Sequence, residues 1–130
     1  MSFTDAVKSA FDNYVNFDGR ASRSAFWWFV LFEVLVLFGL YIIGAALFDS
    51  AVLYFLGVLA LFLPALAVAI RRLHDTNRSG WWYLIGLIPF GGIVLIVFWV
   101  QDSDPGDNDH GPPPADKGPG AAAPPPAPAA

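Results

Sequence analysis

The chain contains no cysteine and few charged residues. The first shortage excludes certain kinds of site, and the second is unusual for a soluble domain. Without cysteine, neither a disulfide framework nor a thiolate metal site can form. Only two histidines are present, too few imidazoles for a zinc site with three or four such ligands. Charged residues make up 14% and hydrophobic residues 56% of the chain, whereas soluble domains average about 25% and roughly 45–50%. The composition therefore favours a protein that lies in a bilayer.

The chain also has no surplus of positive charge. Residues 1–100 carry six basic and six acidic side chains, which sum to zero, whereas residues 101–130 carry one lysine and five aspartates, which sum to −4. The net charge of −4 therefore belongs entirely to the C-terminal segment. Because no basic patch of the size that nucleic acids require is present, we expect no nucleic-acid partner.

The first eighteen residues are amphipathic. They lack the basic start, the unbroken apolar stretch and the small-residue cleavage site of a signal peptide. Instead, apolar residues recur at helical spacing between Phe3 and Val15, with charged and amide residues between them. The pattern predicts a short amphipathic helix within residues 1–18 that lies in the membrane interface. A helix packed on the protein's own loop is the alternative.

Three long apolar runs follow, at 25–47, 51–70 and 81–100. A helix needs about 20 apolar residues to cross the hydrocarbon core, so each run is long enough for one span. Pro64 and Pro89 predict kinks in the second and third runs, because proline removes a backbone donor and crowds the preceding turn. For the third run we predict a simple kinked helix. A re-entrant hairpin, whose non-helical backbone would have to be covered by protein, is the main alternative.

The composition changes abruptly after the third run. From Gln101 the chain is rich in Asp, Pro, Gly and Asn, and beyond Lys117 it is almost entirely Ala, Pro and Gly. Such a segment cannot bury enough apolar surface to offset its ordering entropy. The sequence thus predicts an all-α integral membrane protein with an interfacial helix at 1–18, three transmembrane helices within 19–100, and a disordered acidic, then Ala/Pro-rich tail at 101–130.

One strongly polar island separates the second and third runs. Arginines at the end of a helix are favourably placed against its dipole, and their guanidinium groups can bind lipid phosphate bidentately. Aspartate or serine can cap the next helix, and tryptophans anchor the membrane interface. A structural role thus accounts for nearly every residue of this motif, whose prominent members are Arg71, Arg72, His74, Asp75, Arg78, Ser79, Gly80, Trp81 and Trp82.

The distribution of basic residues predicts an orientation. Cytoplasmic loops are enriched in lysine and arginine, and here such residues precede the first run and fill the loop between the second and third, but are absent between the first and second. We therefore expect the N-terminus and the 71–80 loop in the cytoplasm and the tail outside. A re-entrant third segment would instead place the tail inside. The residues counted are Lys8, Arg20, Arg23, Arg71, Arg72 and Arg78.

Three short segments resemble the signatures of one family. The segment RRLHDTNRSGWW at 71–82 resembles its central signature almost residue for residue, and FDGRASRSAFWW at 17–28 resembles its opening one. PGDNDHGP at 105–112 resembles its closing signature, with His110 where an aromatic residue is usual. The chain is thus similar, over about residues 3–114, to the domain of unknown function 805 family of small bacterial inner-membrane proteins. The resemblance implies an inner-membrane location and brings no established activity.

Glu33 is the one acidic or basic residue in the first apolar run. A charge at the centre of a spanning helix costs about 2.5–3.5 kcal/mol on insertion scales, so such a residue usually faces a partner or a water-filled cavity. We hypothesise that Glu33 pairs with Arg71 or Arg72, which approach from the same side of the membrane. A protonated Glu33 that is hydrogen-bonded to a neighbouring helix is the alternative.

No set of residues suits catalysis. His74 and Asp75 are adjacent, and neighbouring residues on a helix point about 100° apart, so they cannot form a dyad on their own. We therefore expect no enzyme, no cofactor and no metal site. The sequence predicts a non-catalytic inner-membrane component (an adaptor, assembly factor or envelope accessory) whose cytoplasmic arginines contact anionic lipid headgroups, a membrane-protein partner or another copy of the chain. An oligomeric small transporter or channel that uses Glu33 is the alternative. The candidate contact residues are Arg20, Arg23, Arg71, Arg72 and Arg78.

Overall fold

The structure is a computed structural model in which residues 1–114 are described. It consists of the α-helices α1 (Phe3–Asp12), α2 (Arg23–Phe48), α3 (Val52–Asp75) and α4 (Gly91–Val100) and the 3-10 helix η1 (Gly80–Leu87). Over residues 1–114 the backbone forms no β-strand, only an isolated bridge between Asn108 and Gly111. The prediction of an all-helical protein is therefore confirmed.

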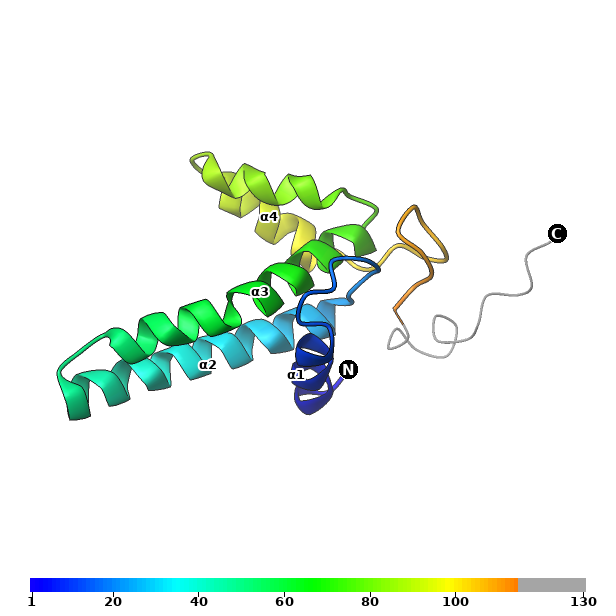
Figure 1. Ribbon diagram of the computed structural model, residues 1–130. Helices are drawn as coiled ribbons and strands as arrows, with labels where there is room; N and C mark the ends of the chain where they lie inside the picture. The colour runs from blue at the N-terminus through cyan, green and yellow to red at the C-terminus, as the bar shows by residue number, and fades with distance from the viewer. Residues whose placement is uncertain (115–130) are drawn as a thin grey trace.

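The helices α2 and α3 form a long antiparallel hairpin (Figure 1). Ser22 caps the start of α2 by accepting a hydrogen bond from the amide of Ala25. Gly57 lets the two helices approach closely, because a Cβ atom at this position would lie 2.5 Å from Cδ1 of Leu40. By length and composition, α2 and α3 are the two helices of the described part of the chain that could cross a membrane.

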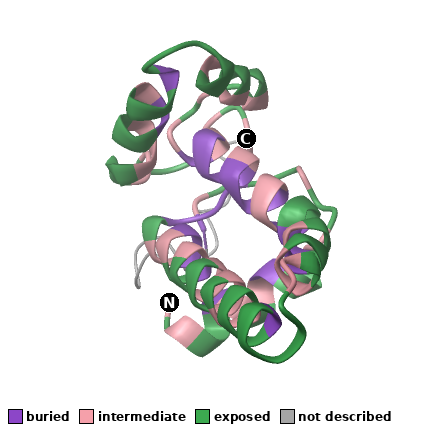
Figure 2. Ribbon diagram, turned by 90° about the vertical axis from the view of Figure 1, so that its left-hand side faces the viewer, coloured by how far each residue is buried: buried purple, intermediate pink, exposed green. Residues whose placement is uncertain are grey.

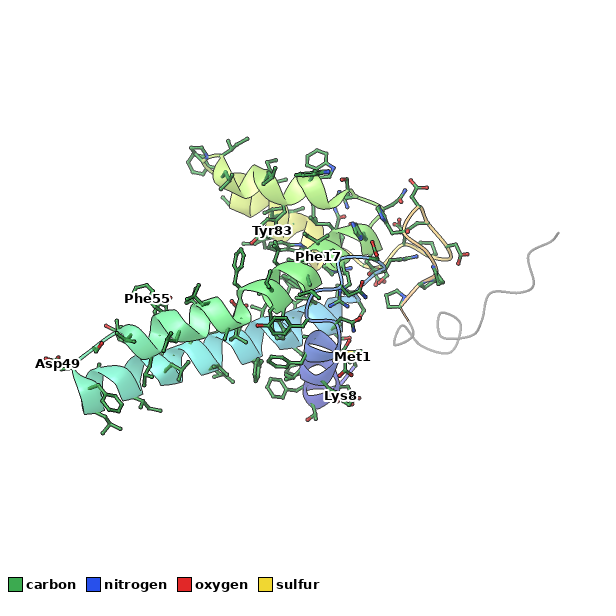
Figure 3. The ribbon with its side chains drawn as sticks, viewed as in Figure 1. Met1, Lys8, Phe17, Asp49, Phe55 and Tyr83 are labelled. Atoms are coloured by element: carbon green, nitrogen blue, oxygen red, sulfur yellow. The ribbon has the colours of Figure 1, made fainter. Side chains whose placement is uncertain are left out.

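The flanks of this hairpin are apolar and largely uncovered. Buried residues gather where the elements meet, whereas the outward surfaces of the helices are exposed (Figure 2). Phe55, for example, projects away from the hairpin (Figure 3) and is 61% exposed. A continuous apolar surface of this size would be unfavourable in water and is what a lipid-facing hairpin requires. The exposed flanks thus agree with the membrane composition of the sequence.

The third apolar run does not form one kinked helix, so that prediction is wrong. Residues 80–87 form η1, the chain reverses, and α4 returns alongside it (Figure 1). Two observations show the return, since the guanidinium of Arg78 donates to Gln101 Oε1 at 2.9 Å and lies 3.9 Å from the ring centroid of Phe98. The third segment is therefore a helical hairpin, the arrangement that we considered as the alternative.

The sequence between η1 and α4 explains the reversal. Pro89 cannot donate to a preceding turn, so it ends the helix instead of kinking it. Phe90 adopts a left-handed conformation, with φ of 65°. At Gly91 a Cβ atom would clash with the carbonyl oxygen of Ile85, so only glycine fits there. Pro64, in contrast, lies inside α3 without ending it.

The amphipathic helix predicted at the N-terminus is present as α1. Ser2 caps it by accepting a hydrogen bond from the amide of Asp5. Its apolar side lies across α2, where the ring of Phe3 is 5.9 Å from that of Trp28 and the ring of Phe11 is 6.3 Å from that of Phe29. The protein itself therefore covers part of the surface that we expected to face lipid.

Residues 101–114 are ordered by contacts with the rest of the molecule, and the prediction that they are disordered is wrong. The amide of Asp104 donates to the carbonyl oxygen of Asp75 at 3.0 Å, and Asn108 and Gly111 exchange two backbone hydrogen bonds of 3.1 Å. The order comes from hydrogen bonds to distant segments, which composition does not report. The remainder of the predicted disordered tail, 115–130, lies outside the described residues.

Candidate functional site: a buried arginine–aspartate cluster

Two arginines share one aspartate at the end of the α2–α3 hairpin where α1 lies. Arg20 Nε is 3.0 Å from Asp75 Oδ1, and Arg72 Nη1 is 2.6 Å from Asp75 Oδ2. The side chains of all three residues, here called the Arg–Asp cluster, are completely buried. Buried charges are destabilising unless they are paired and hydrogen-bonded, so the remaining donors of the arginines must also find partners.

Arg20 uses its remaining donors to hold residues 101–114. Its Nη1 donates to the carbonyl oxygens of Gly106 at 2.7 Å and Gly111 at 3.2 Å. Its Nη2 donates to the carbonyl oxygens of Asp104 at 2.7 Å and Asp75 at 3.2 Å. A single side chain from the α1–α2 connector thus fastens the segment that follows α4 to the end of α3.

Arg72 ties the end of α4 to the same place. Its Nε donates to the carbonyl oxygen of Trp99 at 3.1 Å, and its Nη1 to that of Ala21 at 3.4 Å. Its Nη2 donates to the carbonyl oxygen of Gln101, and the hydroxyl of Ser103 donates to Asp75 Oδ2. The cluster therefore joins the α1–α2 connector, the end of α3 and the end of α4.

The two histidines also meet here, although the 71–80 loop, which contains His74, and the tail, which contains His110, were expected on opposite sides of the membrane. The rings of His74 and His110 are stacked, with centroids 3.9 Å apart and planes inclined by 3°. The side-chain amide of Asn108 donates to the carbonyl oxygen of His74 at 3.0 Å, and the amide of Asp109 donates to Asn77 Oδ1 at 3.1 Å. His110 thus provides the flat ring expected at an aromatic position.

These contacts correct the predicted orientation. Residues 101–114 lie beside the 71–80 loop, so the prediction that the beginning of the tail lies across the membrane from this loop is wrong. The physical reason is the reversal at Pro89, which brings the chain back to the end from which it left. The polar end of the molecule, as used below, comprises residues 13–24, 71–80 and 101–114.

The structure separates the five arginines that we expected to contact lipid or a partner. Arg20 and Arg72 are enclosed in the Arg–Asp cluster, so they are not available for such contacts. Arg23 is half-exposed, and its guanidinium lies 3.7 Å from a carboxylate oxygen of Asp102. Arg78 lies over Phe98 as described above. Arg71 is buried, and two of its nitrogens have no hydrogen-bond partner among residues 1–114.

Other residues of the central motif shape the start of η1. Ser79 caps this helix by accepting a hydrogen bond from the amide of Trp81 at 3.2 Å. At Gly80 a Cβ atom would lie 2.7 Å from Cγ2 of Ile70, so glycine allows η1 to approach α3. The side chain of Trp81 is 79% exposed and that of Trp82 is 46% exposed, which leaves both partly free for lipid or protein.

The hypothesised pair between Glu33 and an arginine is not formed. Glu33 is half-buried on α2, and among residues 1–114 it has no hydrogen bond or ion pair. Arg72 pairs instead with Asp75, three positions later on the same helix, a spacing that places side chains side by side. That spacing was the local signal for the pair, and our sequence reasoning missed it.

The described residues form no group suited to a metal ion. Within residues 1–114, no three histidine, aspartate or glutamate side chains are grouped so that they could hold a metal ion. The Arg–Asp cluster itself is closed to solvent and its groups are bonded to one another. What this geometry can do is hold three distant segments in fixed positions.

The family match covers the residues that form the cluster. The sequence matches the family described as Protein of unknown function (DUF805) over residues 14–112. The chain belongs to this family. The matched range contains every residue of the Arg–Asp cluster and all the carbonyl groups that its arginines bind. The three segments that resemble family signatures, 17–28, 71–82 and 105–112, all lie within the matched range and meet at the polar end.

Named relatives agree with the membrane composition. The chain is 45% identical over 105 residues to Inner membrane protein YhaI of Escherichia coli (strain K12), a match that spans 79% of this chain and 89% of the relative. It is 43% identical over 108 residues to Inner membrane protein YhaH of the same strain, with 78% and 89% spanned. No solved structure is significantly similar to the chain. The relatives and the apolar helices confirm the prediction of a bacterial membrane protein.

Proposed function

We propose that this DUF805 protein is a non-catalytic component of the bacterial inner membrane that presents its polar end to a partner protein. The observation that carries the proposal is the Arg–Asp cluster. Its charges are bonded internally and hold three segments in place, which is the behaviour of a scaffold and not of a reactive centre. The names of the relatives support the location in the inner membrane.

In the proposed topology, α2 and α3 cross the membrane as a hairpin, and η1 and α4 enter from the same side without crossing. The N-terminal segment, the 71–80 loop and residues 101–114 then share one side, with the turn at Asp49 on the other (Figure 3). Because basic residues favour the cytoplasm, the polar end is assigned to the cytoplasm. This orientation differs from our sequence prediction only in the side of residues 101–114.

The absence of cysteine makes the topology directly testable. Single cysteines are introduced as Ser50→Cys, in the turn between α2 and α3, and Asp107→Cys, at the polar end. A membrane-impermeant maleimide added to intact spheroplasts is expected to label the first variant and not the second, whereas lysis exposes both. Labelling of both variants, or of Asp107→Cys alone, in intact spheroplasts would contradict the proposed topology.

Trp81 is the position from which a partner is best sought. It belongs to the family signature, yet its side chain is 79% exposed beside the polar end. A photo-crosslinking residue at Trp81 is expected to capture one membrane protein in a fixed ratio, whereas the same residue at Leu47, at the far end of the hairpin, should not. The capture should disappear when Asp75→Asn disrupts the polar end. Capture of only lipid and further copies of the chain at both positions would contradict the adaptor role.

Glu33 favours a second candidate function, because it is an acidic residue on a membrane helix and has no partner among the described residues. In an oligomeric transporter or channel, this carboxyl group would face a water-filled path between copies. Proton or ion flux into liposomes that contain the purified protein, abolished by Glu33→Gln, would support this function. Equal flux with both proteins would exclude it.

A further inference from the structure

Arg71 differs from its neighbour Arg72 in one respect, because part of its guanidinium is buried without a partner. The residue is only 6% exposed. Its Nε and Nη2 atoms have no hydrogen bond to any described residue. Leaving a buried charged group unpaired is strongly destabilising, so a site of this kind points to a missing anion.

The two unpaired atoms lie on the same edge of the guanidinium group. Nε and Nη2 present two parallel N–H donors, which is the edge that binds a carboxylate or phosphate group side-on with two hydrogen bonds. Arg20 uses this same edge, since its Nε and Nη2 bind a carboxylate oxygen and the carbonyl oxygen of Asp75. On Arg71 no described residue accepts a hydrogen bond from this edge.

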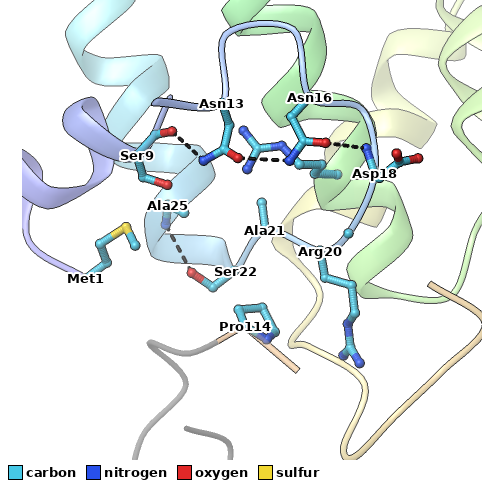
Figure 4. A pocket seen from close by; sticks show the side chains of 12 residues that line it. Met1, Ser9, Asn13, Asn16, Asp18, Arg20, Ala21, Ser22, Ala25 and Pro114 are labelled. Carbon is cyan, nitrogen blue, oxygen red and sulfur yellow. Dashed lines mark hydrogen bonds between the residues drawn. The ribbon is translucent and has the colours of Figure 1, made fainter. Parts of the chain in front are cut away.

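Arg71 also lines a pocket of about 470 Å³, here called the Arg71 pocket. It lies between α1, the α1–α2 connector and the end of α3, with Asn13, Asn16, Ser22 and Pro114 around it (Figure 4). The pocket is larger than a bare oxyanion requires, so it can also accept the atoms to which a phosphate group is esterified.

The surroundings of the pocket favour negative charge. The lining includes Ser22 and Ala25 at the N-terminus of α2, and the N-terminus of a helix attracts anions. It also includes Met1, whose ammonium group donates to Ser24 Oγ at 3.0 Å. Asp18 is the one acidic lining residue and is exposed. The N-terminus of α2 and the buried Arg71 are therefore opposed by a single exposed carboxylate, since Arg20 is already paired with Asp75.

We propose that the Arg71 pocket binds a phosphate group, with Arg71 as its anchor. The binding chemistry rests on the geometry above, and only the source of the phosphate rests on the proposed function. If the polar end lies at the membrane surface as proposed, the expected source is the phosphate of an anionic lipid headgroup. A soluble phosphate ester offers the same chemistry and is distinguished below.

The test is the thermal stability of the purified full-length chain in phosphate-free detergent, followed by tryptophan fluorescence. The probes are inorganic phosphate, glycerol 3-phosphate and phosphatidylglycerol in mixed micelles. At saturation, a phosphate-bearing probe is expected to raise Tm by about 5 °C, because a ligand that binds only the folded state stabilises it. Phosphatidylcholine micelles, which are neutral overall, should give a smaller rise than phosphatidylglycerol.

The decisive variant is Arg71→Met, which removes the anchor with little change in volume. It is expected to show no rise with any probe, and without a probe to be at least as stable as the wild type, because the unpaired buried charge is gone. Arg71→Lys, which keeps the charge but loses the two-donor edge, should show about half of the rise. Lys8→Gln, which removes an exposed charge from α1, should keep the full rise and so controls for net charge.

Each outcome decides the proposal. A rise with phosphatidylglycerol alone assigns the site to lipid, and a rise with glycerol 3-phosphate as well assigns it to phosphate esters in general. No rise in the wild type, or an equal rise in Arg71→Met, overturns the proposal. A lower Tm of Asp116→Asn than of the wild type, measured without a probe, would also overturn the proposal. In that case the chain's own carboxyl group would occupy the Arg71 pocket. The cysteine-labelling and crosslinking results do not involve Arg71, so the proposed function stands or fails separately.

Discussion

The two ends of the α2–α3 hairpin are held together by different means. At the polar end, buried charges join segments that are far apart in the chain, since Arg20 and Asp75 are separated by 55 residues. At the other end the contacts are local, where the amide of Ser50 donates to the carbonyl oxygen of Gly44 at 3.1 Å, and apolar flanks are left to the surroundings.

The difference shows where the specificity of this fold resides. Contacts between apolar side chains are hardly more favourable in free energy than contacts with lipid, because lipid tails are equally apolar. Charged groups buried in protein have no such substitute, so each must meet a particular partner. We therefore expect substitutions of the buried charges at the polar end to be more disruptive than shape changes along the α2–α3 hairpin. The four predictions below run from the largest expected effect to the smallest. In each, the free energy of unfolding is measured by denaturant titration in mixed micelles unless another measurement is named.

The largest effect is expected at Asp75. Asp75→Asn keeps the shape but leaves two buried arginines without a carboxylate, so the free energy of unfolding should fall by about 3–5 kcal/mol. The control is Asp102→Asn, whose 3.7 Å pair with Arg23 is exposed on both sides, and here a loss under about 1 kcal/mol is expected. Similar losses for the two variants would show that the Arg–Asp cluster does not stabilise the polar end.

The second effect concerns the reversal between η1 and α4. Gly91→Ala would place a Cβ atom against the carbonyl oxygen of Ile85. Because this oxygen belongs to the backbone, it cannot move aside without opening the hairpin formed by η1 and α4. We expect a loss of about 1–3 kcal/mol. Gly92→Ala is the matched control, because a Cβ atom there meets nothing within 4 Å. If Gly92→Ala lowers the free energy of unfolding as much as Gly91→Ala does, the close contact at Gly91 does not stabilise the η1–α4 hairpin.

The third effect concerns the apolar contact between α2 and α3 along the hairpin. In Gly57→Ala the new methyl group meets Cδ1 of Leu40 at 2.5 Å and Cδ2 of Leu37 at 3.1 Å. Because these are flexible side-chain ends next to lipid, they can shift, and a loss of only about 1 kcal/mol is expected. Gly39→Ala, where the added atom meets nothing within 4 Å, should lose nothing. A loss at Gly57 that exceeds the loss at Asp75 would reverse the order of the two ends.

Local sequence signals predicted the elements well. Ser2, Ser22 and Ser79 each cap a helix, and an aspartate or serine was expected to do so before the third run. The apolar runs at 25–47 and 51–70 correspond to α2 and α3. Hydropathy, however, measures the length of an apolar run and not its path. It could not distinguish a helix that crosses at 81–100 from a hairpin that returns, although Pro89 and Gly91 carried the signal for the reversal.

The candidate site was harder to predict because its parts are remote in sequence. The spacing of Arg72 and Asp75 is a local signal, but nothing local indicates that Arg20 joins them. The same holds for 101–114, where composition predicted disorder. Order there comes from the carbonyl groups that Arg20 binds at Asp104, Gly106 and Gly111, a tertiary effect that polar composition conceals. The unpaired edge of Arg71 likewise becomes visible only when the neighbours of every nitrogen are known.

The smallest effect on global unfolding is expected at His110, which tests whether ring contact stabilises the polar end locally beyond its charges. His110→Ala removes the ring that stacks on His74 at 3.9 Å, and about 0.5–1.5 kcal/mol of local stability should be lost. The loss should appear as faster hydrogen exchange at the backbone amides of residues 104–111, with global unfolding little changed because Arg20 still holds the segment. His110→Phe restores a flat ring and should exchange like the wild type. If phenylalanine and alanine give equally fast exchange, the stack does not fasten this segment, and its order depends on Arg20 and the backbone hydrogen bonds.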